Sequence, residues 1–224
     1  MKKQIQIAID GPAAAGKSTI AKKTAELLGY TYVDTGAMYR AITYKAIQFN
    51  IDLQDGEKLT KLLDETSIEL KPSSRGQIVF LDNEEITEEI RSEEVTASVS
   101  IVAAHANLRE EMVLRQLEMG KNGGIVMDGR DIGTHVLTNA ELKVFMSASV
   151  EERAKRRFLE NQKRGISTNI EILMKEIALR DKMDSEREAS PLIKAEDAIF
   201  IDTTSLTIEQ VSEKIMELAK ERMI

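Results

Sequence analysis

The chain has 224 residues, with 38 acidic and 31 basic side chains and a formal net charge of −7. This acidic balance argues against a protein that binds nucleic acid or an anionic membrane by general electrostatic attraction. The chain has no cysteine and only two histidines, which excludes disulfides and structural thiolate zinc sites and argues against a histidine metal cluster.

The amino-terminal stretch MKKQIQIAIDG has two lysines but an apolar run that is too short and too polar for a signal peptide. No apolar run elsewhere approaches the length of a membrane span. We therefore expect a soluble cytoplasmic protein whose partners include neither a membrane nor a nucleic acid.

Four short apolar runs along the chain each end in an aspartate: Asp10, Asp34, Asp128 and Asp202. A fifth run, LKVFMSA, covers residues 142–148. Helical patterns separate the runs, and this alternation predicts an α/β fold with a five-stranded parallel sheet and helices on both faces. Ligands bind such sheets at the carboxyl ends of the strands, so we expect the four aspartates to line the site.

A Gly-rich turn follows the first predicted strand. Residues 11–18, GPAAAGKS, fit the pattern G-x-x-x-x-G-K-[ST], and the amphipathic helix KSTIAKKTAELLG follows. The N–H groups of such a loop hold phosphate oxygens, its lysine reaches the β and γ oxygens, and its hydroxyl binds Mg²⁺. The residues expected to hold a nucleoside triphosphate are Gly11, Pro12, Ala13, Ala14, Ala15, Gly16, Lys17, Ser18 and Thr19.

The segment from about 66 to 91 breaks the alternation of strands and helices. Its short apolar runs are separated by polar turn residues, in SIEL-KPSSRGQ-IVFL-DNEE-ITEEI. This pattern predicts a small antiparallel hairpin or three-stranded sheet that is inserted into the α/β core.

Several arginines follow the predicted strand ends or lie on later helices. Arg40 lies one turn into the helix that DTGAMYR begins, and Arg130 lies between two aspartates in DGRDIGT. The stretch EERAKRRFLENQKRG, residues 151–165, has three arginines on one helical face, which without a phosphate loop would suggest an ordinary solvated surface. Arg180 and Arg187 are predicted to lie two turns apart on one side of another helix.

The phosphate loop alone is compatible with a GTPase, a motor ATPase or a small-molecule kinase. The chain lacks the guanine-reading motif N-K-x-D and is shorter than a typical motor ATPase. The arginines favour a kinase that transfers a γ-phosphoryl group to a small acceptor. A kinase for AMP, UMP or a hydroxy acid and a nucleotide-dependent switch remain open on these grounds.

In these motifs the sequence resembles the bacterial cytidylate kinases, which are nucleoside monophosphate kinases with a phosphate-binding loop. The resemblance covers nearly the whole chain. It rests on IDGPAAAGKST, DTGAMYR, the EEIRSEEV…SIVAA…LRE stretch, DGRDIGT, EERAKRR and RDKMDSEREASPL, in that order. The insert also resembles the one that separates these enzymes from adenylate kinases and eukaryotic UMP/CMP kinases.

The resemblance implies the P-loop NTPase fold, with ATP as phosphoryl donor, Mg²⁺ as metal, and CMP or dCMP as acceptor. It implies an ATP-binding core at 1–34, 107–150 and 166–224, an acceptor-binding domain at 35–106 that includes the insert, and a short helical lid at 151–165. A monomer that closes around its substrates is the simpler expectation.

The resemblance also implies roles for individual residues. Arg40 and Arg130 would bind the CMP phosphate with help from Thr35, and Asp184 with Arg180 or Arg187 would bind the pentose. Ser18 would bind Mg²⁺, with Asp128 acting through water. The catalytic residues implied are Lys17, Arg130, Arg157 and Arg180. The substrate-binding residues implied are Thr35, Tyr39, Arg40, Ser100, Arg109, Asp128, Gly129, Arg130, Asp131, Arg180, Asp184 and Arg187.

Ser100, Arg109 and Asp131 would read the cytosine base. Cytosine offers a 4-amino donor beside the N3 and O2 acceptors, so a carboxylate or hydroxyl can accept from the amine while an arginine donates to the ring. Uracil has a carbonyl at position 4, and its unpaired contact with Asp131 would cost about 1–3 kcal/mol. The alternative is that Ser100 and Arg109 are ordinary residues on a helix surface.

Overall fold

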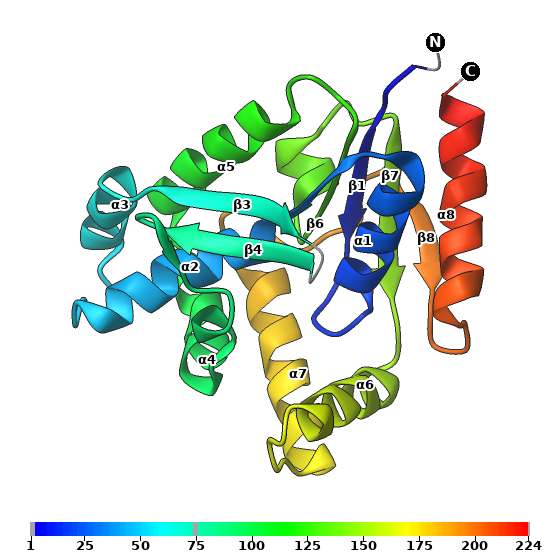
Figure 1. The fold of residues 1–224 in the computed structure, drawn as a ribbon. Coiled ribbons are helices and arrows are strands. Elements are labelled where there is room, and N and C mark those ends of the chain that lie inside the picture. Colours follow the sequence, from blue (N-terminus) through cyan, green and yellow to red (C-terminus); the bar gives the residue numbers. More distant parts are fainter. Residues whose placement is uncertain (1–2, 74–75, 224) are drawn as a thin grey trace.

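The computed structural model describes residues 3–73 and 76–223 (Figure 1). Residues 1 and 2 of the amino-terminal stretch and residues 74 and 75 of the predicted insert lie outside this part. Five strands form one parallel sheet in the order β2-β6-β1-β7-β8, which confirms the predicted sheet. Their bounds are Gln6–Asp10 for β1, Thr31–Asp34 for β2, Ile125–Gly129 for β6, Leu142–Ser147 for β7 and Ile199–Asp202 for β8.

Helices cover both faces of this sheet. Ile7 and Ile9 of β1 pack with α1 and α8 on one face, while Ala8 packs on the other with the turn η2 and α5. Because both faces are buried, the strands read as nearly continuous apolar runs. The bounds of these elements are Lys17–Leu28 for α1, Ala106–Gly120 for α5, Ile132–Val136 for η2 and Ile208–Arg222 for α8.

A second apolar core lies beside the sheet. Met38 and Ile42 of α2 pack there with Leu59 and Leu63 of α3 and with Leu108 of α5. The elements around this core form from the chain between the second strand and α5. They are α2 (Thr35–Gln48), α3 (Gly56–Asp64), η1 (Glu89–Arg91) and α4 (Glu93–Val102).

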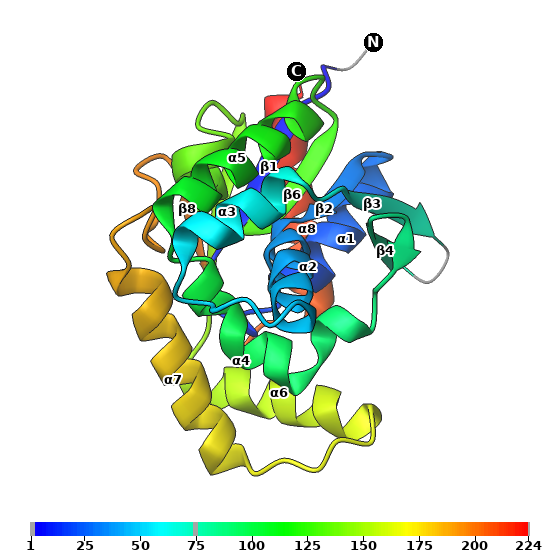
Figure 2. The ribbon, with the colours of Figure 1, turned by 90° about the vertical axis from the view of Figure 1, so that its left-hand side faces the viewer.

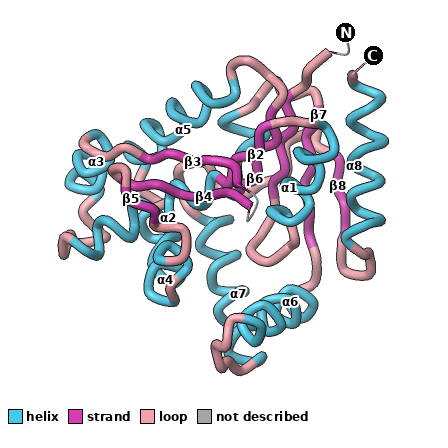
Figure 3. Tube along the Cα trace, in the orientation of Figure 1, coloured by secondary structure: helices cyan, strands magenta, loops and turns pink. Residues whose placement is uncertain are grey.

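The predicted insert forms a separate antiparallel sheet of three strands, so the three-stranded alternative is confirmed and the simple hairpin is not. Figure 3 shows its two long strands lying apart from the parallel sheet, beside β2. Leu70 packs against both the second apolar core and the sheet cluster around Ala8, which attaches the insert to its neighbours. The strands are β3 (Ile68–Ser73), β4 (Gly76–Leu81) and β5 (Glu84–Glu85).

Two helices, α6 (Val150–Lys163) and α7 (Ile170–Glu186), pack on each other through Ala154, Leu173 and Ile177 (Figure 2). The prediction that one helix carries both Arg180 and Arg187 is wrong, because α7 ends at Glu186 and Arg187 is extended. The chain folds back at that point, since the N–H of Leu192 donates to the Asp184 carbonyl over 2.8 Å. No helix in the described part of the chain is long and apolar enough to cross a membrane.

Candidate active site

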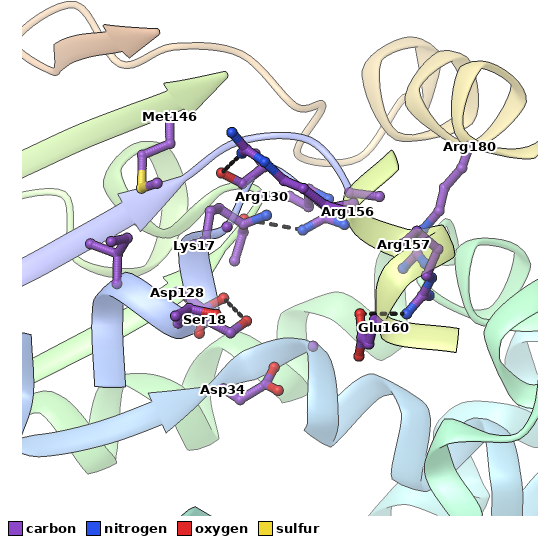
Figure 4. A pocket seen from close by; sticks show the side chains of 18 of the residues that line it. Lys17, Ser18, Asp34, Asp128, Arg130, Met146, Arg156, Arg157, Glu160 and Arg180 are labelled. Atoms are coloured by element: carbon purple, nitrogen blue, oxygen red, sulfur yellow. Dashed lines mark hydrogen bonds and ion pairs between the residues drawn. The ribbon is translucent and has the colours of Figure 1, made fainter. Parts of the chain in front are cut away.

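A cavity of about 770 Å³ opens at the carboxyl ends of β2 and β6 (Figure 4). It is lined by the loop before α1, the start of α2, helices α4, α6 and α7, and the segment after β8. Of the residues implied for nucleotide binding, substrate binding and catalysis, all except Gly11 and Pro12 line it. Asp34 and Arg156, which the strand ends and the helical spacing had pointed to, also line it. The sequence did not single out Lys22 and Arg91, which line it as well.

Two of the four aspartates at strand ends do not line the cavity, contrary to expectation. Asp10 is buried beside it, where its carboxylate accepts from the N–H groups of Ile132 (2.8 Å) and Gly133 (2.7 Å). Asp202 is exposed and accepts from the N–H and hydroxyl of Thr204. Asp10 holds the turn after the neighbouring strand β6, and Asp202 holds the turn after its own strand β8. Of the four aspartates, Asp34 and Asp128 line the cavity.

The phosphate-binding loop has a backbone that requires glycine. At Gly11, φ is 148° and an added Cβ would lie 2.0 Å from the Met146 carbonyl oxygen, so β7 excludes any side chain there. Gly16 precedes α1 with a φ of 89°, again in the left-handed region. The loop thus turns sharply from β1 into α1 and presents the helix N-terminus to the cavity, as anion binding requires.

Lys17 is buried beneath the loop. Its ammonium group donates to the Pro12 carbonyl over 2.8 Å. Burial, followed by the positive charge of Arg130, lowers the pKa of Lys17 from its ordinary 10.5 to about 7. The negative charge of a bound polyphosphate would raise the pKa of Lys17 again. The loop is therefore arranged so that a bound anion keeps Lys17 protonated.

A hydroxyl and a carboxylate meet between the loop and the end of β6. The Ser18 hydroxyl donates to one oxygen of Asp128 over 2.8 Å (Figure 4). The Tyr32 phenol donates to the other oxygen over 2.7 Å. Burial, reinforced by the charge of Asp34, raises the pKa of Asp128 to about 6. A cation bound here would relieve that repulsion, and both groups offer the oxygen ligands that Mg²⁺ prefers.

Arginines surround the other half of the cavity. Arg40 pairs with the Asp34 carboxylate over 2.9 Å, and Arg130 pairs with Asp184 over 2.8 Å. Burial, and then the charge of Arg130, lowers the pKa of Arg180 to about 9. Within the described residues, the Nε atoms of Arg40, Arg91 and Arg180 are buried without a hydrogen-bond partner. This excess of buried cationic donors suits an anionic ligand such as a phosphate.

Helix α6 supplies two arginines to the cavity instead of three. Arg157 lines it and pairs with Glu160 over 3.4 Å, while Arg156 donates to the Thr203 carbonyl over 2.6 Å. Arg153 lies outside the cavity lining, because its side chain reaches across to the carboxylate of Asp181 on α7 over 2.7 Å. The shared helical face predicted from the spacing therefore divides between ligand cavity and helix packing.

The three residues predicted to read a base are buried and belong to two hydrogen-bonded groups that line the same cavity. Ser100, Arg109 and Asp131 are 7%, 2% and 4% exposed, so neither Ser100 nor Arg109 is an ordinary surface residue. Arg109 bonds to the Asp131 carboxylate and to the Ala103 carbonyl, and Ser100 donates to Asp184. The Arg187 guanidinium lies 3.7 Å from the other oxygen of Asp131.

Tyr39 lies against Arg109, which pairs with Asp131. The Arg109 guanidinium is 5.2 Å from the centre of its ring, a cation–π contact. Its hydroxyl is buried and has no partner within the described residues. A planar, polar ligand that reached this end of the cavity would find an aromatic ring, a guanidinium and carboxylate acceptors together.

The chain is similar to known proteins over nearly its whole length. The family model described as cytidylate kinase matches residues 7–221. A cytidylate kinase of Lysinibacillus sphaericus (strain C3-41) is 65% identical over 224 residues, 100% of both chains. One of Bacillus subtilis (strain 168) is 61% identical over 222 residues, 99% of both. The crystal structure of an uncharacterized protein from Eubacterium ventriosum ATCC 27560 shares the fold alone, with a TM-score of 0.52 at 13% identity over 98% of this chain and 99% of that one.

Proposed function

The chain belongs to the cytidylate kinase family, and from that premise we propose that its cavity transfers the γ-phosphoryl group of ATP to CMP or dCMP. The products are ADP and CDP or dCDP. One observation carries the proposal: a single cavity is lined by the phosphate loop with Lys17, by the acceptor arginines and by the buried residues Ser100, Arg109 and Asp131. A donor phosphate and an acceptor nucleotide can therefore meet inside it.

The chemistry asks mainly for positioning and charge neutralisation. The 5′-phosphate of CMP is anionic near neutral pH, so its oxygen attacks the γ-phosphorus in line without a strong general base. Lys17 neutralises charge on the transferred group, with Arg157 and Arg180 beside it, while Arg40, Arg130 and Thr35 hold the acceptor phosphate. The paired arginines Arg40 and Arg130 are mostly buried in the cavity wall, where charge is more effective than in bulk water.

The donor set fits Mg²⁺ bound together with a triphosphate. When bound, the metal supplies charge neutralisation at the β and γ oxygens. The Ser18 hydroxyl would bind it directly and Asp128 through water. Within the described residues no three acidic or histidine side chains gather into a metal site of their own, which agrees with a magnesium site completed by substrate phosphates and water.

The sugar and the base of CMP are assigned to the far end of the cavity. Asp184 lies between Ser100 and Arg130, 3.2 Å and 2.8 Å away, so a pentose there would bridge the phosphate and base subsites. Asp131 accepts from the cytosine amine while Arg109 donates to the ring, and the ring of Tyr39 supports the base.

The parts of the chain are assigned to these tasks as follows. The ATP-binding core is assigned to residues 1–34, 107–150 and 166–224. The acceptor-binding part is assigned to residues 35–106 and the lid to residues 151–165. A monomer in the cytoplasm is the simplest state for an enzyme of this kind, and both properties stay predictions.

The acceptor is identified by a coupled assay of ADP release with CMP, dCMP, UMP, AMP, GMP and shikimate. We expect ADP formation to require an acceptor and to be fastest with CMP or dCMP. A nucleotide-dependent switch would instead release ADP slowly and at the same rate without any acceptor. A faster rate with AMP, UMP or shikimate would show a kinase for another acceptor.

The same assay with Asp131→Asn tests the base-reading assignment. The carboxamide presents an N–H₂ group that can donate to the uracil 4-carbonyl, so we expect the preference for CMP over UMP to narrow by about tenfold. Asp197→Asn is the matched control, because Asp197 also pairs with a mostly buried cation, Lys143 at 2.9 Å, but lies outside the cavity lining. An unchanged CMP to UMP ratio in Asp131→Asn would remove Asp131 from the base-reading set.

A further inference from the structure

Gln77, on strand β4 of the insert, reaches across to the edge strand of the parallel sheet. Its side-chain amide nitrogen donates to the Tyr32 carbonyl over 2.6 Å, and its side-chain oxygen accepts from the Asp34 N–H over 3.1 Å. The residues joined here are more than 40 positions apart in the sequence. No other described hydrogen bond joins the insert to the backbone of β2.

The carboxamide of Gln77 takes the place of a missing neighbour strand. β2 is at the edge of the sheet, with β6 on one side only. The N–H of Thr31 points toward β6, since it donates to Gly124 over 2.9 Å. Successive residues of a strand point to alternate sides, so the backbone groups of Tyr32 and Asp34 point to the open edge. A carboxamide places an N–H donor beside a carbonyl acceptor, as a strand backbone does along its edge, and here both groups pair with β2.

The two residues that Gln77 holds lead into opposite halves of the cavity. The Tyr32 phenol donates to Asp128, beside the phosphate loop. Asp34 lines the cavity and begins α2, where its carboxylate accepts from the Ala37 N–H and from Arg40, each over 2.9 Å. Burial alone would raise the pKa of Asp34, but Arg40 and the Ala37 N–H hold it below its ordinary value, so the carboxylate is charged.

The backbone of Asp34 is thus fixed from outside the cavity while its side chain orients Arg40 within it. The Nε of Arg40 is buried and has no hydrogen-bond partner within the described residues. Among the ion pairs of the described residues, Arg40 takes part only in the one with Asp34, so the direction of its guanidinium depends on that carboxylate. A small rotation of the Asp34 backbone would displace the guanidinium at its far end by a larger distance. Misplacing a binding group by about 1 Å is enough to reduce its contribution strongly.

A second contact places the insert tip near the donor side. A Cβ on Gly76, next to Gln77, would lie 3.5 Å from the Lys22 ammonium, and that ammonium lies 5.7 Å from the centre of the Tyr32 ring. The insert therefore meets β2 and α1 together, and Gln77 supplies the hydrogen bonds of this junction.

We propose that Gln77 is a positioning residue for the acceptor phosphate, acting through Asp34 on Arg40. This inference rests on the proposed function, in which Arg40 binds the phosphate of CMP. It assigns to the insert a role in acceptor binding, although its Gln77 does not contact the reacting groups. The insert holds in place the end of β2 that carries Asp34.

The test is a double-mutant cycle on the KM for CMP. Gln77→Met keeps the side-chain length and loses both hydrogen bonds, and we expect it to raise KM for CMP about tenfold while KM for ATP changes by less than about twofold. In an Arg40→Ala background, where the positioned group is absent, Gln77→Met should change KM for CMP by less than about twofold. Glu84→Ala, on the exposed strand β5 of the same insert, is the control and should match wild type.

Three results would overturn the inference. They are an unchanged KM for CMP in Gln77→Met, an equal rise in KM for ATP and CMP, and the same rise with and without Arg40. The last two would mean that Gln77 only supports the fold, and thermal unfolding of each variant shows whether stability changes in parallel. If wild-type protein forms no ADP in response to CMP, the proposed function fails instead, and the two failures are distinguishable.

Discussion

Lys17→Ala is expected to lower kcat for CDP formation about a thousandfold and to leave the protein folded. The ammonium group of Lys17 lies under the phosphate loop and is the cation placed to neutralise charge on the transferred phosphoryl group. Its effect is large because the site is buried, where a single charge interacts strongly with a developing charge. Steady-state rates of ADP release with saturating ATP and CMP measure the loss.

A measurement of thermal stability distinguishes lost catalysis in Lys17→Ala from a loss of folded protein. The pKa of Lys17 in the folded, empty protein is about 7, below the ordinary 10.5. Because the unfolded chain binds this proton more tightly, the free energy of unfolding is highest above pH 10.5 and decreases as the pH falls toward 7. The Lys17→Ala variant has no such decrease in the free energy of unfolding. The unfolding temperature of the variant at pH 7 should therefore equal or exceed that of wild type.

The matched control is Lys23→Ala. Lys23 lies on the same helix, and its ammonium is 3.5 Å from the exposed carboxylate of Glu209, outside the cavity lining. Its removal should leave kcat near the wild-type value. A Lys17→Ala protein with near wild-type kcat would contradict the assignment of Lys17 to the transferred group.

Arg130→Met is expected to lower kcat/KM for CMP by about a hundredfold to a thousandfold. Arg130 lines the cavity and pairs with Asp184 through its Nε, and its charge contributes to lowering the pKa of both Lys17 and Arg180. Removing it takes a cation from the acceptor phosphate and also leaves Asp184 with one partner fewer. The variant is assayed by the initial rate against CMP concentration at saturating ATP.

Arg115→Met is the control for this prediction. Arg115 also makes several hydrogen bonds, to Glu111 and to the carbonyls of Leu63 and Thr66, but it lies on α5 outside the cavity lining. It should lose stability without a selective loss of CMP turnover. A kcat/KM for Arg130→Met within about threefold of wild type would show that Arg130 serves only to pair with Asp184.

The sheet and the phosphate loop could be predicted because their signals are local. Each strand is a short apolar run, since both faces of the sheet are buried, and the loop is defined by the spacing of Gly11, Gly16 and Lys17 along the chain. The three-stranded insert was also within reach, because its turns are marked by proline, glycine and asparagine. These features depend on neighbours in sequence and not on the packing of distant segments.

Residues that act through distant contacts gave no such signal. Tyr32 and Gln77 look like an ordinary strand residue and an ordinary polar residue after a turn, and only the folded chain brings them to Asp128 and to the β2 edge. Arg91, at the end of the insert, lines the cavity because η1 packs near α2.

The errors have the same origin. Arg153 shares a helical face with Arg157, yet Asp181 on the next helix draws it out of the cavity lining. Asp10 ends a central strand as Asp128 does, yet two backbone N–H groups of the η2 turn occupy its carboxylate. Spacing predicts which face a side chain takes, while its partner in the fold decides what it does there.

In the proposed reaction, one cavity passes a phosphoryl group directly from ATP to the phosphate of CMP. This transfer is tested most directly with ATP that carries isotopically labelled oxygen in its γ-phosphoryl group, incubated with the protein, Mg²⁺ and CMP and followed by phosphorus NMR. We expect the label to appear in the β-phosphate of CDP, with one ADP formed for each CDP and no labelled inorganic phosphate. Label released as inorganic phosphate, with CMP unchanged, would contradict it.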